Sequence, residues 1–129
     1  MEPLYKINTA NTEIWIDTEG ILILKLTDAE VDLDEVRICF DAYVNLGCGP
    51  TNKVLQLIFV RGEGSMTHEA RKYVSGIGKD FFIASAIVSN SLAVRLIVNF
   101  FNAFYKHDVP FKMFANEDEA REWLRGFKK

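Results

Sequence analysis

Residues 54–71, VLQLIFVRGEGSMTHEAR, decide the fold class of this chain. The opening run, Val54–Val60, is almost entirely apolar, which predicts a strand buried on both faces of a sheet. Gly62 and Gly64 then mark a loop. Thr67 stands where a hydroxyl group caps the N-terminus of a helix, which we expect to run to about Val74. A buried strand that leads through a short loop into a helix is the repeating unit of a parallel sheet.

The segment before this stretch predicts a hairpin and a helix. Two β-rich runs, at residues 14–17 and 21–26, flank a turn that contains glycine, which is typical of a β-hairpin. Asp32 followed by Glu35 predicts a capped helix N-terminus, and Gly47 ends that helix. We therefore expect an antiparallel pair of strands at the start of the sheet.

Two further strand–helix units follow. Strands are expected at residues 81–88 and 111–114. The first leads into a helix that extends to about Lys106, and the second leads into a C-terminal helix capped by Asn116. The resulting order is ββαβαβαβα. It predicts an α/β fold with a mostly parallel sheet of four to five strands, an N-terminal β-hairpin and about four helices, in a single domain of residues 1–129.

Composition narrows the class of protein. The chain has 129 residues, of which 49% are apolar and 26% charged, and its formal charge is −3. Its basic residues form no run, so we expect no nucleic-acid partner. The first residues do not lead into the apolar segment that is typical of a signal peptide, so we predict no signal peptide. We also predict no transmembrane segment. The two cysteines have no metal or redox spacing. These features favour a cytoplasmic protein of bacterial type.

The helix that begins at Leu92 is unusually apolar. Arg95, Asn99 and Asn102, with Lys106, form one narrow polar stripe, and most of the remaining circumference is apolar. A helix of this kind is buried on two sides or presents an apolar surface to a partner. We expect a homodimer through it, with coverage by a neighbouring helix of the same chain as the alternative. The residues assigned to this interface are Leu92, Leu96, Ile97, Phe100, Phe101 and Phe104.

Over residues 14–127 the chain resembles the SpoIIAA-like, or STAS/SEC14-like, bacterial proteins. The likeness rests on the order of the elements and on the stretches 86–92, 99–101, 109–114 and 117–124. The resemblance implies a regulatory domain similar to anti-sigma-factor antagonists, which act through protein partners. It also implies a serine at the N-terminus of the helix after the second parallel strand, where such proteins are phosphorylated.

This sequence departs from the usual Asp-Ser-Ser-Gly-like run at that position. It has Ser65-Met-Thr-His68, in which Thr67 matches the phosphorylated position best and Ser65 comes second. A phosphate there would add negative charge beside a helix N-terminus. The alternative is that Thr67 is only a helix cap, and both interpretations are open at this point.

The loops at the carboxyl edge of the sheet predict a second candidate site. Ligands of parallel sheets bind at this edge, and two helix N-termini there attract anions. The spacing is not that of a P-loop, and we expect no cofactor and no metal ion. The residues of this candidate anion- or ligand-binding rim are Arg61, Gly62, Gly64, Ser89, Asn90 and Ser91.

Three functions remain in competition. The first is a non-enzymatic regulatory or protein-interaction domain that forms homodimers. The second is a carrier of a small lipid-like or phosphate-bearing molecule, bound between the third helix and the sheet as the SEC14-like resemblance suggests. The third is an enzyme that uses Cys48 with His107 and Asp108, which share one edge of the predicted sheet. No catalytic set of residues stands out, so we predict no enzymatic activity.

Overall fold

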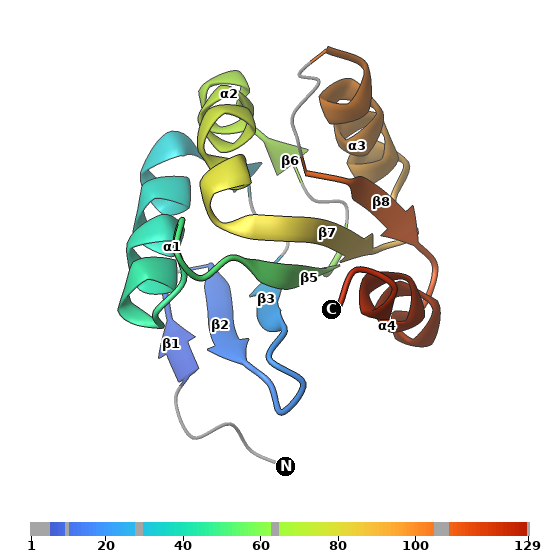
Figure 1. The fold of residues 1–129 in the computed structure, drawn as a ribbon. Coiled ribbons are helices and arrows are strands. Elements are labelled where there is room, and N and C mark those ends of the chain that lie inside the picture. Colours follow the sequence, from blue (N-terminus) through green and yellow to red (C-terminus); the bar gives the residue numbers. More distant parts are fainter. Residues whose placement is uncertain (1–5, 10, 28–29, 63–64, 105–108, 129) are drawn as a thin grey trace.

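The computed structural model describes residues 6–9, 11–27, 30–62, 65–104 and 109–128, without the side chain of residue 104 (Figure 1). The strands are β1 (Lys6–Asn8), β2 (Thr12–Ile16), β3 (Leu22–Leu26), β4 (Glu30–Val31), β5 (Val54–Val60), β6 (Ser65–Met66), β7 (Phe82–Val88) and β8 (Phe111–Phe114). The helices are α1 (Leu33–Asn45), α2 (His68–Ile77), α3 (Leu92–Phe104) and α4 (Glu117–Arg125), with a 3-10 turn, η1, at Gly78–Asp80.

The main sheet confirms the predicted fold class. Its strand order is β1-β2-β3-β5-β7-β8. The first three strands pair antiparallel, whereas β3, β5, β7 and β8 pair parallel. The sheet has six strands instead of four to five. The additional strand, β1, is short and carries a single apolar residue, Ile7, so it has no strand-like pattern of its own.

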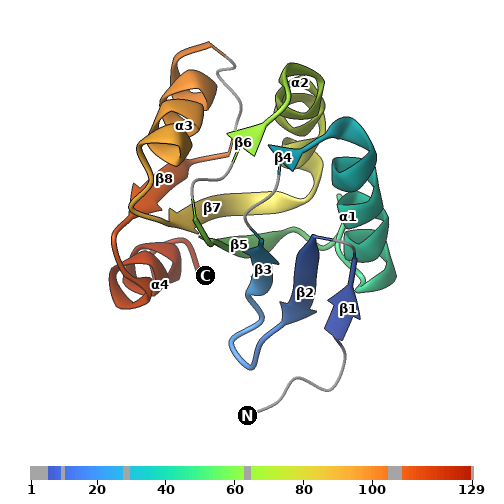
Figure 2. The ribbon, with the colours of Figure 1, turned by 180° about the vertical axis from the view of Figure 1, so that it is seen from behind.

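Helices cover both faces of this sheet. Helices α1, α2 and α3 lie over one face, where Leu22 and Leu24 belong to the core. Helix α4 covers the other face through Ala120 and Leu124, which pack with Ile23 of β3 and its neighbours (Figures 1 and 2). Alternate residues of β3 thus point into two different cores.

The helix ends follow the capping signals of the sequence. The Asp32 carboxylate accepts a hydrogen bond of 2.9 Å from the Glu35 backbone N–H. The Asn116 amide oxygen accepts one of 2.9 Å from Glu119. After α1 the chain turns at Gly47, whose φ of 92° lies in the left-handed region that favours glycine.

A second, two-stranded sheet was not predicted. Strands β4 and β6 pair parallel, with Glu30 opposite Ser65 and Val31 opposite Met66. Figure 2 shows the pair between α3 and α1. Two-residue strands are too short to produce a periodic sequence pattern. Their position matters because β6 leads directly into Thr67 and α2.

Candidate functional site

The carboxyl edge of the sheet carries an open groove of about 700 Å³. The groove lies where β3, β5 and β7 end. Five of the six predicted rim residues line it together: Arg61, Gly62, Ser89, Asn90 and Ser91. Gly64 lies outside the described residues. The topology argument therefore brought these residues to one edge of the sheet, as the structure shows, and their role as a ligand-binding rim stays a prediction.

The acidic side chains of the groove are neutralised by partners. The Glu13 carboxylate lies 2.9 Å from the Lys6 ammonium, and this hydrogen bond lowers the pKa of Glu13. The Glu117 carboxylate lies 2.7 Å from the Nε atom of Arg121. Both acids line the groove, so each acidic side chain among the described lining residues has a basic partner.

The basic side chains of the groove form no ion pair with a described residue, although Lys25 faces Glu13 across β2 and β3 and, after Lys6, both Lys25 and Arg61 help to lower the pKa of Glu13. The Lys25 ammonium lies over the rings of Trp15 and Phe59, with 5.4 Å and 5.8 Å to their centroids. The Arg61 side chain is exposed and forms no ion pair with any residue that the structure describes. Among the described residues of the groove, Arg61 at the strand ends is thus available to an incoming anionic group, whereas Lys25 lies on the face of the sheet that carries Trp15 and Phe59.

Hydroxyl groups hold the start of α3 at the groove. The Ser89 Oγ atom accepts a 3.1 Å hydrogen bond from the Ser91 N–H, and Ser89 itself is buried. The Ser91 Oγ atom accepts one of 3.3 Å from the Val94 N–H, as expected of an N-cap residue. These contacts orient the first turn of α3 without providing a ligand-binding group by themselves.

Thr67 is the N-cap residue of α2. Its Oγ1 atom accepts a 3.2 Å hydrogen bond from the Ala70 backbone N–H, and the residue is half-buried. Ser65, the other candidate phosphosite, is exposed on β6. The Arg71 guanidinium donates to the Met66 carbonyl oxygen at 3.1 Å and thereby ties α2 to β6.

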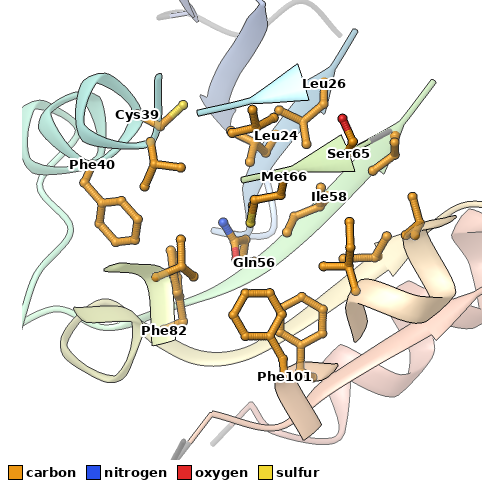
Figure 3. Close-up of a pocket in the computed structure, with 18 of the residues that line it drawn as sticks. Leu24, Leu26, Cys39, Phe40, Gln56, Ile58, Ser65, Met66, Phe82 and Phe101 are labelled. Carbon is orange, nitrogen blue, oxygen red and sulfur yellow. The ribbon is translucent and has the colours of Figure 1, made fainter. Parts of the chain in front are cut away.

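A separate, apolar cavity of about 100 Å³ lies between the sheet and the three helices on its first face. Figure 3 shows Leu24 and Ile58 of the sheet on one side, with Met66 of β6 and Phe101 of α3 around the same space. Every lining side chain belongs to a described residue, and none of them carries a charge. The cavity can therefore accept an uncharged, mostly hydrocarbon group.

The buried polar groups around this cavity are already paired. The Ser85 hydroxyl donates a 2.8 Å hydrogen bond to the Gln56 amide oxygen, and both residues are buried. Burial raises the pKa of Tyr43 well above its usual value, while a hydrogen bond with Gln56 acts in the opposite direction. Among the described residues, no side-chain atom that lines the cavity is buried without a partner. The cavity wall is thus chemically apolar.

Of the predicted interface residues on α3, some are exposed and others are buried. Leu92 and Leu96 are exposed, by 68% and 60%. Ile97 and Phe100 are half-buried, and the Arg71 guanidinium lies 4.8 Å from the centroid of the Phe100 ring. The side chain of Phe104 lies outside the described residues.

The assignment of Phe101 to a dimer interface was wrong. Phe101 is only 2% exposed, and its ring stacks on Phe111 of β8 with 5.6 Å between the centroids. It follows Val94 and Val98 along α3 at helical spacing, and all three are buried. The sequence showed that α3 is apolar on several sides, but it could not show which side meets the sheet.

Neither cysteine resembles an activated nucleophile. Cys39 and Cys48 are free and buried. Burial raises the pKa of Cys39 to about 11, and burial also raises that of Cys48. Thiols of this kind are mostly protonated at neutral pH and react slowly. His107 and Asp108, the proposed partners of Cys48, lie outside the described residues.

Two other classes of site find no support in the described part of the chain. No group of three or more histidine, cysteine or acidic side chains is placed there to hold a metal ion. None of the helices in those ranges combines the length and apolar character needed to cross a bilayer.

The carrier hypothesis expected a ligand between the third helix and the sheet, where this cavity lies, but sequence reasoning named none of its lining residues, although one signal was present. Gln56 is the single polar residue in the run VLQLIFV, and a polar residue in a doubly buried strand needs partners. Those partners come from α1 and β7, and the rest of the lining comes from elements spread along the chain. Only the folded structure brings them together.

Comparison with known proteins defines the family and supports the fold. A family model described as a domain of unknown function, DUF7793, matches residues 14–128. A solved structure of an uncharacterised DUF3478-family protein with a SpoIIAA-like fold, from Shewanella loihica PV-4, is similar with a TM-score of 0.65. The two chains are 16% identical, and the match covers 96% of this chain and 98% of that one. No curated protein matches this chain. The predicted resemblance to SpoIIAA-like proteins is thus confirmed for the fold.

Proposed function

The chain belongs to the DUF7793 family and has a SpoIIAA-like fold, and from this premise we propose that it is a non-enzymatic regulatory domain that binds other proteins and forms homodimers. The observation that carries the proposal is the exposure of Leu92 and Leu96 on the first turns of α3. These two leucines lie one helical turn apart on the same face. Large apolar side chains that share an exposed face favour a protein interface.

The same helix connects the interface to the candidate phosphosite. Phe100 of α3 lies beneath the Arg71 guanidinium, which also binds the Met66 carbonyl next to Thr67. A phosphate at Thr67 or Ser65 would bring negative charge close to Arg71 and to the N-terminus of α2. It would therefore compete for the guanidinium that links α2, β6 and α3. Phosphorylation at this point would regulate the position of α3.

The interface is tested with Leu96→Glu, and Val44→Glu is its matched control. Val44 is 58% exposed on α1, close to the 60% of Leu96, so both variants place a carboxylate on an exposed apolar position. Burying the exposed part of a leucine is worth roughly 1–2 kcal/mol, and a two-fold interface contains it twice, so Leu96→Glu should weaken the dimer at least about thirtyfold.

Native mass spectrometry over a concentration series measures this effect. We expect dimers for the wild type and for Val44→Glu, and monomers for Leu96→Glu. A wild-type protein that stays monomeric at every concentration contradicts the dimer. A phosphate-sized mass increment on the protein from its own host, located at Thr67 or Ser65, would support the regulatory part of the proposal.

The apolar cavity favours a second candidate function, the carriage of a small molecule beneath α3. Its volume of about 100 Å³ is of the order of the ~150 Å³ engineered cavities that stay dry and bind benzene. Hexanol is a suitable uncharged probe. Carriage predicts that hexanol raises the thermal midpoint of the wild type in a saturable manner, whereas a midpoint that does not respond contradicts it.

A further inference from the structure

The apolar cavity and the charged groove meet at the ends of β3 and β5. Leu26, Thr27 and Val60 line both of them. The cavity lies on the face of the sheet covered by α1, α2 and α3, and the groove extends from the same strand ends past Arg61 onto the other face, where Lys25 lies over Trp15 and Phe59. An apolar space whose lining carries no charge thus adjoins an open space in which Arg61 forms no ion pair with a described residue.

We propose that this chain binds an amphiphilic anion, whose apolar group of about six carbons fills the cavity beneath α3 and whose negatively charged head lies at the strand ends beside Arg61. The inference rests on the carrier candidate and adds the chemical class of its ligand. Carboxylate and phosphate-monoester heads share the required chemistry, because a guanidinium group binds either of them.

The charge distribution distinguishes this class from neutral or cationic ligands. The acids of the groove, Glu13 and Glu117, already bind Lys6 and Arg121. The Arg61 guanidinium has no ion-pair partner in the described ranges, so an anionic head would supply one. A cationic head would instead meet Arg61 as a like charge.

The size of the cavity limits the apolar part of the ligand. Each buried methylene contributes roughly 0.8 kcal/mol, which corresponds to about fourfold in affinity. We therefore expect affinity to rise steeply from butyrate to hexanoate and to level off beyond octanoate, once the space of about 100 Å³ is filled. A chain that lay on the outer surface would show no such limit.

The test compares heads of different charge on the same chain by isothermal calorimetry. Octanoate and octyl phosphate represent the two anionic sources, octanol is the neutral analogue, and inorganic phosphate represents a head alone. We expect both anions to bind more tightly than octanol, and phosphate alone to bind most weakly. Whichever anion binds more tightly identifies the preferred head. If octanol binds as tightly as both anions, the proposed anionic head is overturned, but the carrier candidate stays intact. If octanoate, octyl phosphate and octanol all fail to bind, both the anionic ligand and the carrier candidate are overturned.

Two charge variants locate the head. Arg61→Gln should weaken octanoate roughly two- to fivefold, the range of an exposed ion pair, and should leave octanol unchanged. Lys53→Gln removes the same charge from an exposed residue just before β5, at the opposite edge of the sheet, and should change neither. Equal effects of the two substitutions on octanoate contradict a head at Arg61.

A cavity variant and a direct contact measurement locate the hydrocarbon chain of the ligand. Ile97 lines the cavity and is half-buried, so the larger ring of Ile97→Phe should fill the space and weaken octanoate and octanol at least tenfold. Ile38→Phe, at an exposed position of α1, is the control. If Ile97→Phe does not fold, the wild type is used to decide whether the octanoate chain lies in the cavity. The measurement is of nuclear Overhauser contacts from the octanoate chain to the methyl groups of Met66 and Ile58. Their absence while octanoate binds overturns the proposal.

Discussion

The hydrogen bond between Gln56 and Ser85 joins the neighbouring strands β5 and β7 beneath the cavity. The Ser85 hydroxyl donates to the Gln56 amide oxygen at 2.8 Å, and the two residues are 2% and 5% exposed. Gln56→Leu leaves the hydroxyl groups of Ser85 and Tyr43 without this partner. Each buried polar group that loses its partner costs about 1–3 kcal/mol, so for the two hydroxyl groups we expect the free energy of unfolding to fall by about 2–6 kcal/mol.

The double variant makes the reasoning quantitative. Ser85→Ala alone leaves the Gln56 amide oxygen without its donor and should cost about 1–2 kcal/mol. In Gln56→Leu/Ser85→Ala neither residue keeps a polar group that lacks a partner. The double variant should therefore cost about 1–2 kcal/mol less than the sum of the two single variants.

Urea unfolding, followed by circular dichroism and by tryptophan fluorescence, measures these free energies. Ser75→Ala is the control, because the Ser75 hydroxyl donates at 2.8 Å to the Lys72 carbonyl at an exposed site of α2. We expect that substitution to cost less than about 0.5 kcal/mol. Costs of Gln56→Leu and Ser85→Ala that simply add, within about 0.5 kcal/mol, would refute a coupled buried pair.

Three further outcomes follow from the caps, the surface ion pairs and the thiols. Thr67→Ala removes the N-cap of α2 and should lower the free energy of unfolding by about 1 kcal/mol, whereas Thr67→Ser should retain most of it in the same urea assay. The hydrogen bond from Arg125 lowers the pKa of Glu19, so this pair stabilises the fold above the unfolded pKa of about 4.3 and loses its effect as the pH falls through the folded value. The stability difference between the wild type and Arg125→Gln should accordingly be present at neutral pH and vanish in acid; a difference that persists in acid contradicts the ion pair as its cause. Cys39 and Cys48 should react with iodoacetamide far more slowly in the native protein than in urea, as followed by mass spectrometry, and fast native alkylation of Cys48 would revive the nucleophile interpretation.

The elements that the sequence predicted are those with a complete local pattern. Strand β5 was visible as an apolar run, and α1 was visible from the Asp32 cap and the apolar residues at helical spacing. The order of such elements also led to the parallel sheet, because strands separated by helices must pair parallel. Strands β1, β4 and β6 were missed because two or three residues cannot express a period.

The candidate sites likewise combine features that the sequence predicted with features that only the fold decided. The rim at Arg61 and Ser89 followed from topology alone, since loops after parallel strands gather at one edge of a sheet. The apolar character of α3 was equally a property of its own residues. Which of its faces is buried was decided by the sheet, and so Phe101 lies in the core while Leu96 is exposed.

The sequence by itself thus determined the classes of element, their order and the edge of the sheet at which the loops after the parallel strands gather, because each depends on neighbouring residues or on chain connectivity. The tertiary structure alone decided the cavity beneath α3, the partners of Gln56 and the strand ends that the cavity shares with the groove. These features depend on how closely side chains from distant segments pack, and packing density is a property of the assembled core.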